Sequence, residues 1–160
     1  MIAVFALHGF LNLSNMAIHY YEVDIASRLK GKRQLSAFLG NLVKEYLPVK
    51  KTDLSYIFCN DDYLLEKNRE FLNHDTLTDI ITFDLSENEA ELAGEIYISV
   101  DRVRENAEKF SMPYNTELHR VIFHGALHLC GFKDKKKEDK AMMTQMENTC
   151  LQKYFELNEI

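Results

Sequence analysis

The segment 113–130 constrains the fold of this chain most, because it is long and apolar on nearly every side. Pro113 suits the first turn of a helix, and Gly131 is placed to end one. A helix that is apolar all round has to be covered by the rest of the chain. The segment therefore predicts a central, buried helix on which any polar side chain needs a partner.

Two histidines, His124 and His128, lie four residues apart on this predicted helix. Positions four apart lie about 40° apart around the helix axis, so both imidazoles can face one ion. Gly131 can adopt the left-handed conformation that turns the chain back, which brings Asp134 toward the histidines. Two histidines and one carboxylate with an open fourth position form a catalytic zinc site. The pattern predicts one Zn²⁺ per chain, with all three side chains as ligands and catalytic residues.

Two alternatives to this ligand set stay open at the level of the sequence. The two histidines could be satisfied in the core without a metal, or Glu138 or Asp139 could replace Asp134 as the third ligand. His119 lies five residues before His124, about 140° around the helix. We therefore expect His119 on the surface and not among the ligands.

Gly125 follows the first histidine of the motif. In H-E-x-x-H peptidases the residue at this position is a glutamate that acts as the general base. The predicted site can lower the pKa of a bound water toward about 7, but it has no glutamate here to accept the proton. A metallopeptidase is therefore the weaker hydrolytic interpretation.

Four strands and four further helices are predicted around the central helix. Strand propensity marks residues 18–23, 53–59, 78–85 and 94–100. Helical spacing marks residues 32–46, 61–72, 101–110 and 138–155. We expect the third and fourth strands to form a hairpin around an acidic turn, and Asp61 or Asp62 to cap the second helix. The order predicts an α+β fold: a mixed four-stranded sheet with about five helices.

The chain has 160 residues, which suits one domain with a real core. Residues 1–15 are apolar but too short to span a bilayer, and we expect a non-structural N-terminal extension followed by a single domain at 16–160. The three cysteines contain no C-x-x-C pair, which indicates reduced thiols in a cytoplasmic protein. The net charge of −6 does not indicate nucleic-acid binding, although a local basic stripe can still bind phosphate.

Polar side chains near the motif are candidates for substrate contacts. Thr78, Asp79 and Thr82 begin the third predicted strand and could contact sugar and phosphate groups. Lys133 and Lys135 belong to a lysine-rich loop around Asp134, which would attract a polyanion. The simpler interpretation is a polar loop and a solvated charged face.

Three sequence blocks, in this order, resemble the YbeY family of bacterial metal-dependent endoribonucleases. They are N-R-E-F-L-N-H-D-T-L-T-D-I-I-T-F-D at 68–84, G-E-I-Y-I-S at 94–99 and H-G-A-L-H-L-C-G-F-K-D at 124–134. The resemblance implies a zinc site like that of metzincin proteases and a single-stranded ribosomal RNA substrate. It also implies a role in small-subunit rRNA maturation and ribosome quality control. The implied partners are ribosomal RNA, the small ribosomal subunit or its proteins, and a ribosome-associated GTPase, with no membrane.

Two positions depart from the pattern of that family. Most members carry a third histidine where this chain has Asp134, and many carry an arginine where it has Leu72. A carboxylate is an accepted zinc ligand, but its charge makes the metal a weaker Lewis acid. The departures keep a rival hypothesis open: a ribosome-assembly binding factor whose metal is only structural.

Overall fold

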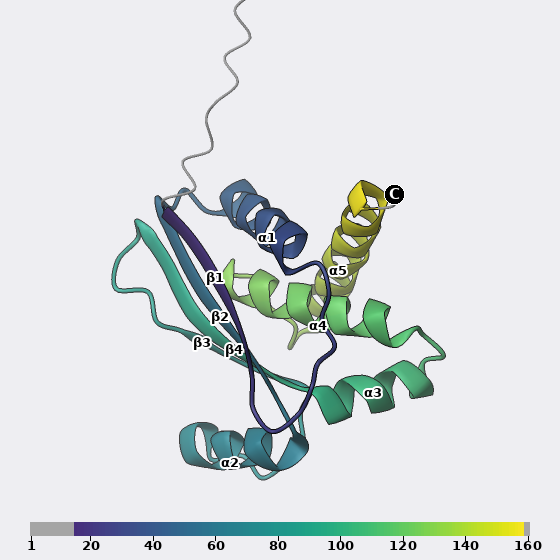
Figure 1. Ribbon diagram of the computed structural model, residues 1–160. Helices are drawn as coiled ribbons and strands as arrows, with labels where there is room; N and C mark the ends of the chain where they lie inside the picture. Colours follow the sequence, from purple (N-terminus) through teal and green to yellow (C-terminus); the bar gives the residue numbers. More distant parts are fainter. Residues whose placement is uncertain (1–14, 159–160) are drawn as a thin grey trace, which may run out of the picture.

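A computed structural model describes residues 15–158 of the chain. Five helices and four strands follow one another along the sequence (Figure 1). They are β1 (Met16–Glu22), α1 (Lys32–Tyr46), β2 (Lys51–Cys59), α2 (Asp61–Leu72), β3 (Ile80–Asp84), β4 (Glu91–Ser99), α3 (Val100–Lys109), α4 (Tyr114–Leu129) and α5 (Lys137–Asn158). The expected N-terminal extension lies, except for Asn15, outside the described residues.

The four strands form one mixed sheet in the order β1-β2-β4-β3. β1, β2 and β4 are parallel, and β3 pairs antiparallel with β4 so that Thr82 lies opposite Ile96. The predicted hairpin and the predicted α+β fold are therefore confirmed. β3 is an edge strand, so the polar residues that precede it lie at the border of the sheet.

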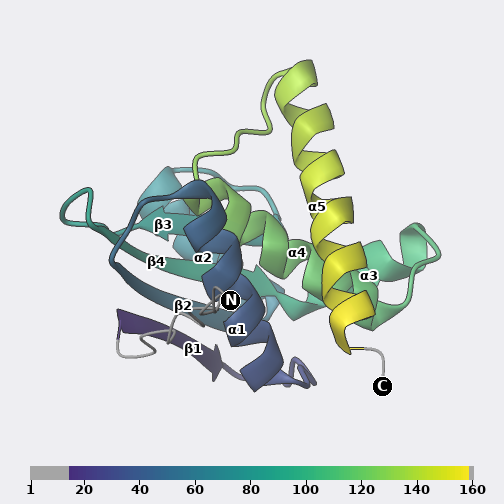
Figure 2. The ribbon, with the colours of Figure 1, turned by 90° about the horizontal axis from the view of Figure 1, so that it is seen from above.

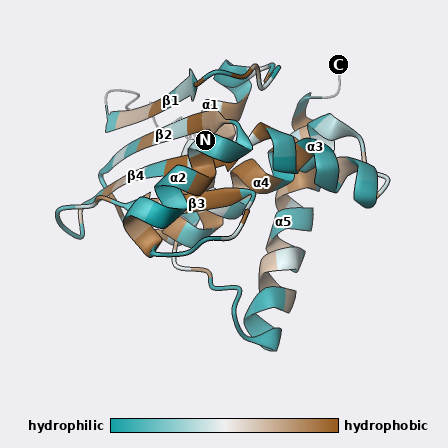
Figure 3. Cartoon of the chain, turned by 90° about the horizontal axis from the view of Figure 1, so that it is seen from below, coloured by the Kyte–Doolittle hydropathy of each residue, from teal (hydrophilic) through white to brown (hydrophobic). Residues whose placement is uncertain are grey.

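Helices cover the two faces of the sheet unequally. α1, α4 and α5 lie on one face and α2 lies on the other (Figures 1 and 2). The larger core joins Leu39 of α1 and Ile122 of α4 to Tyr56 of β2, while a smaller core around Leu64 and Ile81 lies under α2. Figure 3 shows hydrophobic residues concentrated on the strands and on α4, and hydrophilic residues over much of α3 and α5.

α4 is the buried central helix that its sequence predicts, but His119 is not on the surface. His119 is 2% exposed, and its ring stacks on Tyr154 of α5, with ring centroids 5.0 Å apart. The Nδ1–H group of His119 donates to the Asn115 carbonyl at 2.7 Å. The surface prediction was wrong because it treated the side opposite His124 as solvated, whereas α5 covers that side.

The cap of α2 also differs from the prediction. Asn60 is the N-cap, and its side chain accepts a hydrogen bond from the Tyr63 amide at 2.9 Å. Asp61 instead accepts hydrogen bonds from Ser99 at 2.7 Å and from Arg102. The first residue able to cap the helix does so, which frees the next carboxylate for a contact with α3.

Two expectations concern the chain as a whole. The three cysteines are free thiols, as their spacing indicates. Within residues 15–158, no helix combines the length and the apolarity needed to cross a membrane.

Candidate metal centre

The chain turns sharply at the end of α4, and Gly131 makes this turn possible. Gly131 has a φ of +100°, a backbone conformation that side chains other than glycine rarely adopt. Its amide donates to the His128 carbonyl at 2.9 Å, and the Phe132 amide donates to the Leu127 carbonyl at 3.0 Å. This pair of hydrogen bonds is the Schellman motif. The predicted reversal is therefore present, and it returns Asp134 to the last turns of α4.

The turn brings the three predicted ligands together. The Asp134 Oδ2 atom lies 3.2 Å from His128 Nε2 and 3.4 Å from His124 Nε2. The two imidazole rings are nearly perpendicular, with centroids 4.4 Å apart. One ligand atom from each of the three side chains lies within 4.8 Å of the others. In the described part of the chain, neither Glu138 nor Asp139 belongs to this group.

The hydrogen bonds made by the two Nδ1 atoms leave the Nε2 atom of each imidazole directed at Asp134. His128 Nδ1 donates to the Phe132 carbonyl at 2.9 Å, and His124 Nδ1 donates to the Glu147 carboxylate at 2.5 Å. Since both acceptors require a proton on Nδ1, the lone pair of each ring in its neutral, metal-binding form is on Nε2, which faces Asp134. Two nitrogens and one carboxylate oxygen fit the donor set of a catalytic zinc ion.

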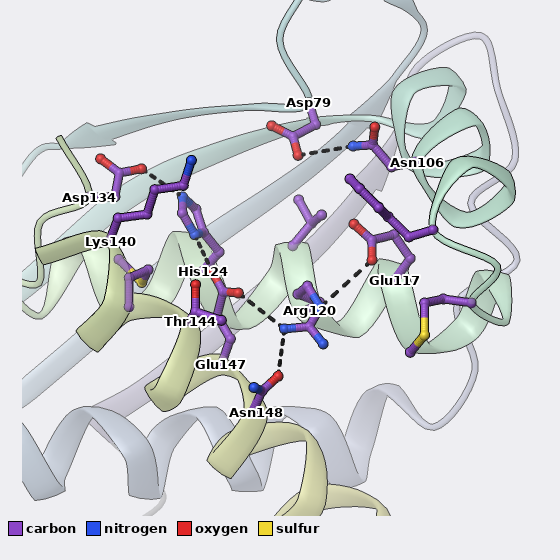
Figure 4. Close-up of a pocket in the computed structure, with 14 residues that line it drawn as sticks. Asp79, Asn106, Glu117, Arg120, His124, Asp134, Lys140, Thr144, Glu147 and Asn148 are labelled. Atoms are coloured by element: carbon purple, nitrogen blue, oxygen red, sulfur yellow. Dashed lines mark hydrogen bonds and ion pairs between the residues drawn. The ribbon is translucent and has the colours of Figure 1, made fainter. Parts of the chain in front are cut away.

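Glu147 is a site residue that the sequence reasoning missed. It comes from α5, 23 positions after His124, and only 8% of it is exposed. Figure 4 shows it between His124 and Arg120, whose Nη1 lies 3.2 Å from its second carboxylate oxygen. The spacing of Glu147 within α5 is the sequence signal that could have revealed its role. Glu147 comes one helical turn after Met143 and three residues before Cys150, and both of these residues are buried.

Charges around the site shift the pKa of several groups. Burial alone would lower the pKa of His124, but the hydrogen bond and charge of Glu147 outweigh it and raise the pKa. Burial raises the pKa of Asp79 and of Glu117. Arg120 is the nearby cation that opposes this rise for Glu117, at 3.7 Å. The carboxylates of Glu147, Asp79 and Asp134 therefore all act on His124, and their negative charge suits a divalent cation.

Two adjoining cavities open on the candidate ligands. The metal cavity, of about 800 Å³, is lined by Asp79, Asn106, Phe110, Met112, Glu117, Arg120, Val121, His124, Asp134, Lys140, Met143, Thr144, Glu147 and Asn148 (Figure 4). The lysine cavity, of about 460 Å³, is lined by His128, Lys133, Asp134, Lys135, Lys136 and Asp139. Asp134 belongs to both, so the ligands lie where the two cavities meet.

The candidate substrate residues are only partly brought together. Asp79 lines the metal cavity, where Asn106 donates to it at 3.5 Å, and Lys133 and Lys135 line the lysine cavity. Thr78 and Thr82 line neither of these two cavities. The Thr78 hydroxyl donates to the Ile80 carbonyl at 3.3 Å, and Thr82 lies within β3.

Gly125 faces the sheet and not the ligands. A Cβ atom added to it would lie 2.7 Å from Ile96 Cγ2 and 2.9 Å from Ile80 Cδ1. A glutamate therefore has no room at this position, and the general base of the H-E-x-x-H peptidases cannot be placed there.

The fold and the site define a class of protein: an α+β domain with a candidate three-ligand metal centre at the end of its central helix. Residues 19–155 match the family profile described as Endoribonuclease YbeY. The chain belongs to the YbeY family of endoribonucleases, as the resemblance of the three sequence blocks indicates.

Relatives match over most of their length. An Endoribonuclease YbeY of Parabacteroides distasonis is 47% identical over 137 residues, which is 85% of this chain and 94% of the relative. That of Flavobacterium psychrophilum is 52% identical over 130 residues, 80% of this chain and 89% of the relative. A solution structure of a Thermotoga maritima protein aligns with a TM-score of 0.58 at 29% identity, covering 86% of this chain and 89% of that one.

Proposed function

We propose that this protein is a zinc-dependent endoribonuclease that cleaves single-stranded ribosomal RNA in the maturation and quality control of the small ribosomal subunit. Membership of the YbeY family supports the reaction class. One observation carries the proposal for the site: the Nε2 atoms of His124 and His128 face the same oxygen of Asp134, at 3.4 and 3.2 Å. We infer one Zn²⁺ per chain, held by these three side chains.

Each group around the ligands has a part in the proposed reaction. A bound zinc ion would polarise a phosphate oxygen and lower the pKa of a water or hydroxyl group. Glu147 keeps His124 in the tautomer and orientation that present Nε2. Asp79 lies across the metal cavity from α4 (Figure 4), in position to hydrogen-bond a ribose hydroxyl. Lys133 and Lys135 would hold phosphates on the lysine side, because their ammonium groups are exposed beside the ligands.

The residues before and within β3 would guide the RNA toward the ligands. Thr82 lies on the edge strand and Thr78 lies just before it, and both residues are partly exposed. The proposed partners are ribosomal RNA, the small ribosomal subunit or its proteins, and a ribosome-associated GTPase in the cytoplasm. The RNA partner is supported by the endoribonuclease family, and the other partners by the resemblance to that family.

Cleavage of defined substrates tests the proposal. The protein should cut a single-stranded ribosomal RNA fragment internally, lose this activity in a chelator and regain it with added zinc. A matched duplex should resist cleavage, and casein should stay intact because Gly125 leaves no place for a catalytic glutamate. A folded, zinc-loaded protein that binds the fragment without cutting it would point to the ribosome-assembly binding factor. Zinc-dependent digestion of casein would favour a metallopeptidase.

A further inference from the structure

A third cavity adjoins the metal cavity on the side away from the lysine cavity. The arginine cavity, of about 610 Å³, is lined by Arg28, Arg104, Ala107, Glu108, Ser111, Met112 and Tyr114. It shares Met112 with the metal cavity, which in turn shares Asp134 with the lysine cavity. The three cavities therefore follow one another along the molecule, and together they are called the track; the candidate metal ligands lie where the metal and lysine cavities meet.

Two arginines and one carboxylate, that of Glu108, line the arginine cavity, so its lining carries a net positive charge. Arg69, Arg102 and Arg120 all pair with carboxylates. In the part of the chain that the structure describes, Arg28 and Arg104 form no ion pair. On a chain with a net charge of −6, two unpaired guanidinium groups in one cavity favour an anionic ligand.

Arg104 is held in a position that leaves most of its donors available. Its guanidinium carbon lies 5.9 Å from the centre of the Tyr114 ring, and Nη2 donates to the Ala26 carbonyl at 3.4 Å. Tyr114 is fixed in turn, because its hydroxyl donates to the Ser27 carbonyl at 2.7 Å. A guanidinium group has five N–H donors in a rigid fork that matches a phosphate, and this contact uses one of them.

The distribution of charge along the track explains why cations are needed at both ends. The metal cavity carries four carboxylates, those of Asp79, Glu117, Asp134 and Glu147, against two cations, Arg120 and Lys140, so its lining is net negative. These carboxylates repel phosphates that are not at the metal, whereas the lysine and arginine cavities attract them. An enzyme that cuts inside an RNA chain has to hold the chain on both sides of the bond. Exposed Phe110, which also lines the metal cavity, offers an aromatic face on which a base can stack.

We propose that the arginine cavity binds a backbone phosphate of single-stranded RNA, on the opposite side of the cleaved bond from the lysine cavity. This inference rests on the proposed endoribonuclease function. It assigns Arg28 and Arg104 to the binding of the longer RNA chain, and not to the cleavage step.

Binding of oligonucleotides of two lengths tests this inference. The probes are a 2′-O-methyl RNA tetranucleotide and a dodecanucleotide, and the readout is fluorescence anisotropy. The variant is R28Q/R104Q, and the control is Arg33→Gln, which removes an exposed charge from α1. Affinity of the double variant for the dodecanucleotide should fall about tenfold at low salt. The slope of log K against log salt should flatten by about 0.7, since each phosphate neutralised on a single strand contributes about that much and the arginine cavity holds one phosphate.

Binding of the tetranucleotide should not change, because it is too short to fill the track. Arg104→Lys should keep most of the salt dependence but lose part of the affinity, since an ammonium group cannot bind a phosphate through two donors. Two results would overturn the inference and leave the nuclease proposal intact. The first is an equal loss of dodecanucleotide affinity in Arg33→Gln and R28Q/R104Q, and the second is unchanged dodecanucleotide affinity in R28Q/R104Q. Wild-type protein that binds neither probe would overturn both.

Discussion

At the scale of single residues, the two candidate histidine ligands are oriented by different means. His128 depends on a backbone carbonyl of the turn that follows it, whereas His124 depends on Glu147, a side chain of another helix. The first contact comes with the local turn, but the second exists only when α5 packs against α4. His124 is therefore the ligand whose orientation a single side-chain change can disturb.

Replacing Glu147 by Gln should weaken zinc binding about 10- to 100-fold, the range typical of the loss of a partner to a metal-bound histidine. The amide is nearly the same size but lacks the charge that holds the Nδ1 proton of His124. Competition with a chromophoric chelator measures the zinc affinity. Glu138→Gln, an equal change of charge in the exposed first turn of α5, is the control. Equal zinc affinity in the wild type and in a folded Glu147→Gln protein would contradict this role.

His119 should make the fold less stable in acid. Burial lowers its pKa, although the hydrogen bond to Asn115 opposes this shift, and in the described part of the chain its Nε2 has no partner. An unfolded histidine has a pKa of about 6.5. Below that pH the unfolded chain binds more protons at this position than the folded one, so the free energy of unfolding falls as the pH decreases.

Replacing His119 by Leu should therefore flatten the loss of stability between about pH 7 and pH 5. Urea denaturation at a series of pH values measures it, with His74→Leu at an exposed position as the control. A wild-type pH dependence in His119→Leu would show that this side chain titrates normally in the folded state.

The sequence predicts the three candidate ligands because their relationship is local. The spacing of His124 and His128 depends only on helix geometry, and Asp134 follows the glycine turn directly. Glu147 could not be predicted in the same way, because its contact depends on how α5 packs on α4. The burial of His119 depends on that same packing.

At the scale of elements, the end of α4 is the part of the structure on which the candidate site depends. The turn at Gly131 determines where Asp134 lies relative to the two histidines. Within residues 15–158, no heavy atom beyond those of the adjacent residues lies within 4 Å of the position that a Cβ at Gly131 would occupy. A substitution there is therefore opposed by the backbone conformation alone.

Gly131→Ala should cost about 1–2 kcal/mol of stability, the typical cost of a left-handed conformation for a residue with a Cβ. It should also weaken zinc binding, because relaxation of the turn moves Asp134. Gly131→Asn should lose less, since asparagine tolerates this region better. Urea denaturation in a chelator separates the effect on the fold from the effect on the metal. Equal stability of all three proteins would contradict the requirement for a positive φ.

The helices follow the predicted limits within a few residues, because their apolar periodicity and their end signals agree. The structure has α1 at the predicted residues and α4 one residue shorter at each end than the segment 113–130. Strand limits shift more: β4 begins at Glu91, inside the predicted acidic turn, because it pairs with β2 from Lys51 onward. Pairing between distant strands determines these ends, and a local pattern does not contain that information.

At the scale of the whole molecule, the core and the candidate site are separable. The larger core spans α1, α4, α5 and the sheet without using the three candidate ligands, which are half-buried at its margin. The fold should therefore persist without metal, in contrast to small domains that a structural zinc ion holds together.

Removing zinc should leave the far-ultraviolet circular dichroism spectrum unchanged. Adding zinc at about 100 times its dissociation constant should raise the free energy of unfolding by about 2.7 kcal/mol. Spectra and thermal melts in chelator and in zinc measure the two effects. Loss of the helical signal in chelator would instead favour a structural metal and the binding-factor hypothesis.

The central claim is that His124, His128 and Asp134 hold one metal ion that is needed to cut RNA. The most direct test is elemental mass spectrometry of the wild type and Asp134→Ala, paired with cleavage of single-stranded ribosomal RNA by the same samples. We predict about one zinc per wild-type chain, and loss of both zinc and cleavage in a folded Asp134→Ala protein. A wild type that cleaves RNA without metal, or an Asp134→Ala protein that keeps both zinc and activity, would contradict the claim.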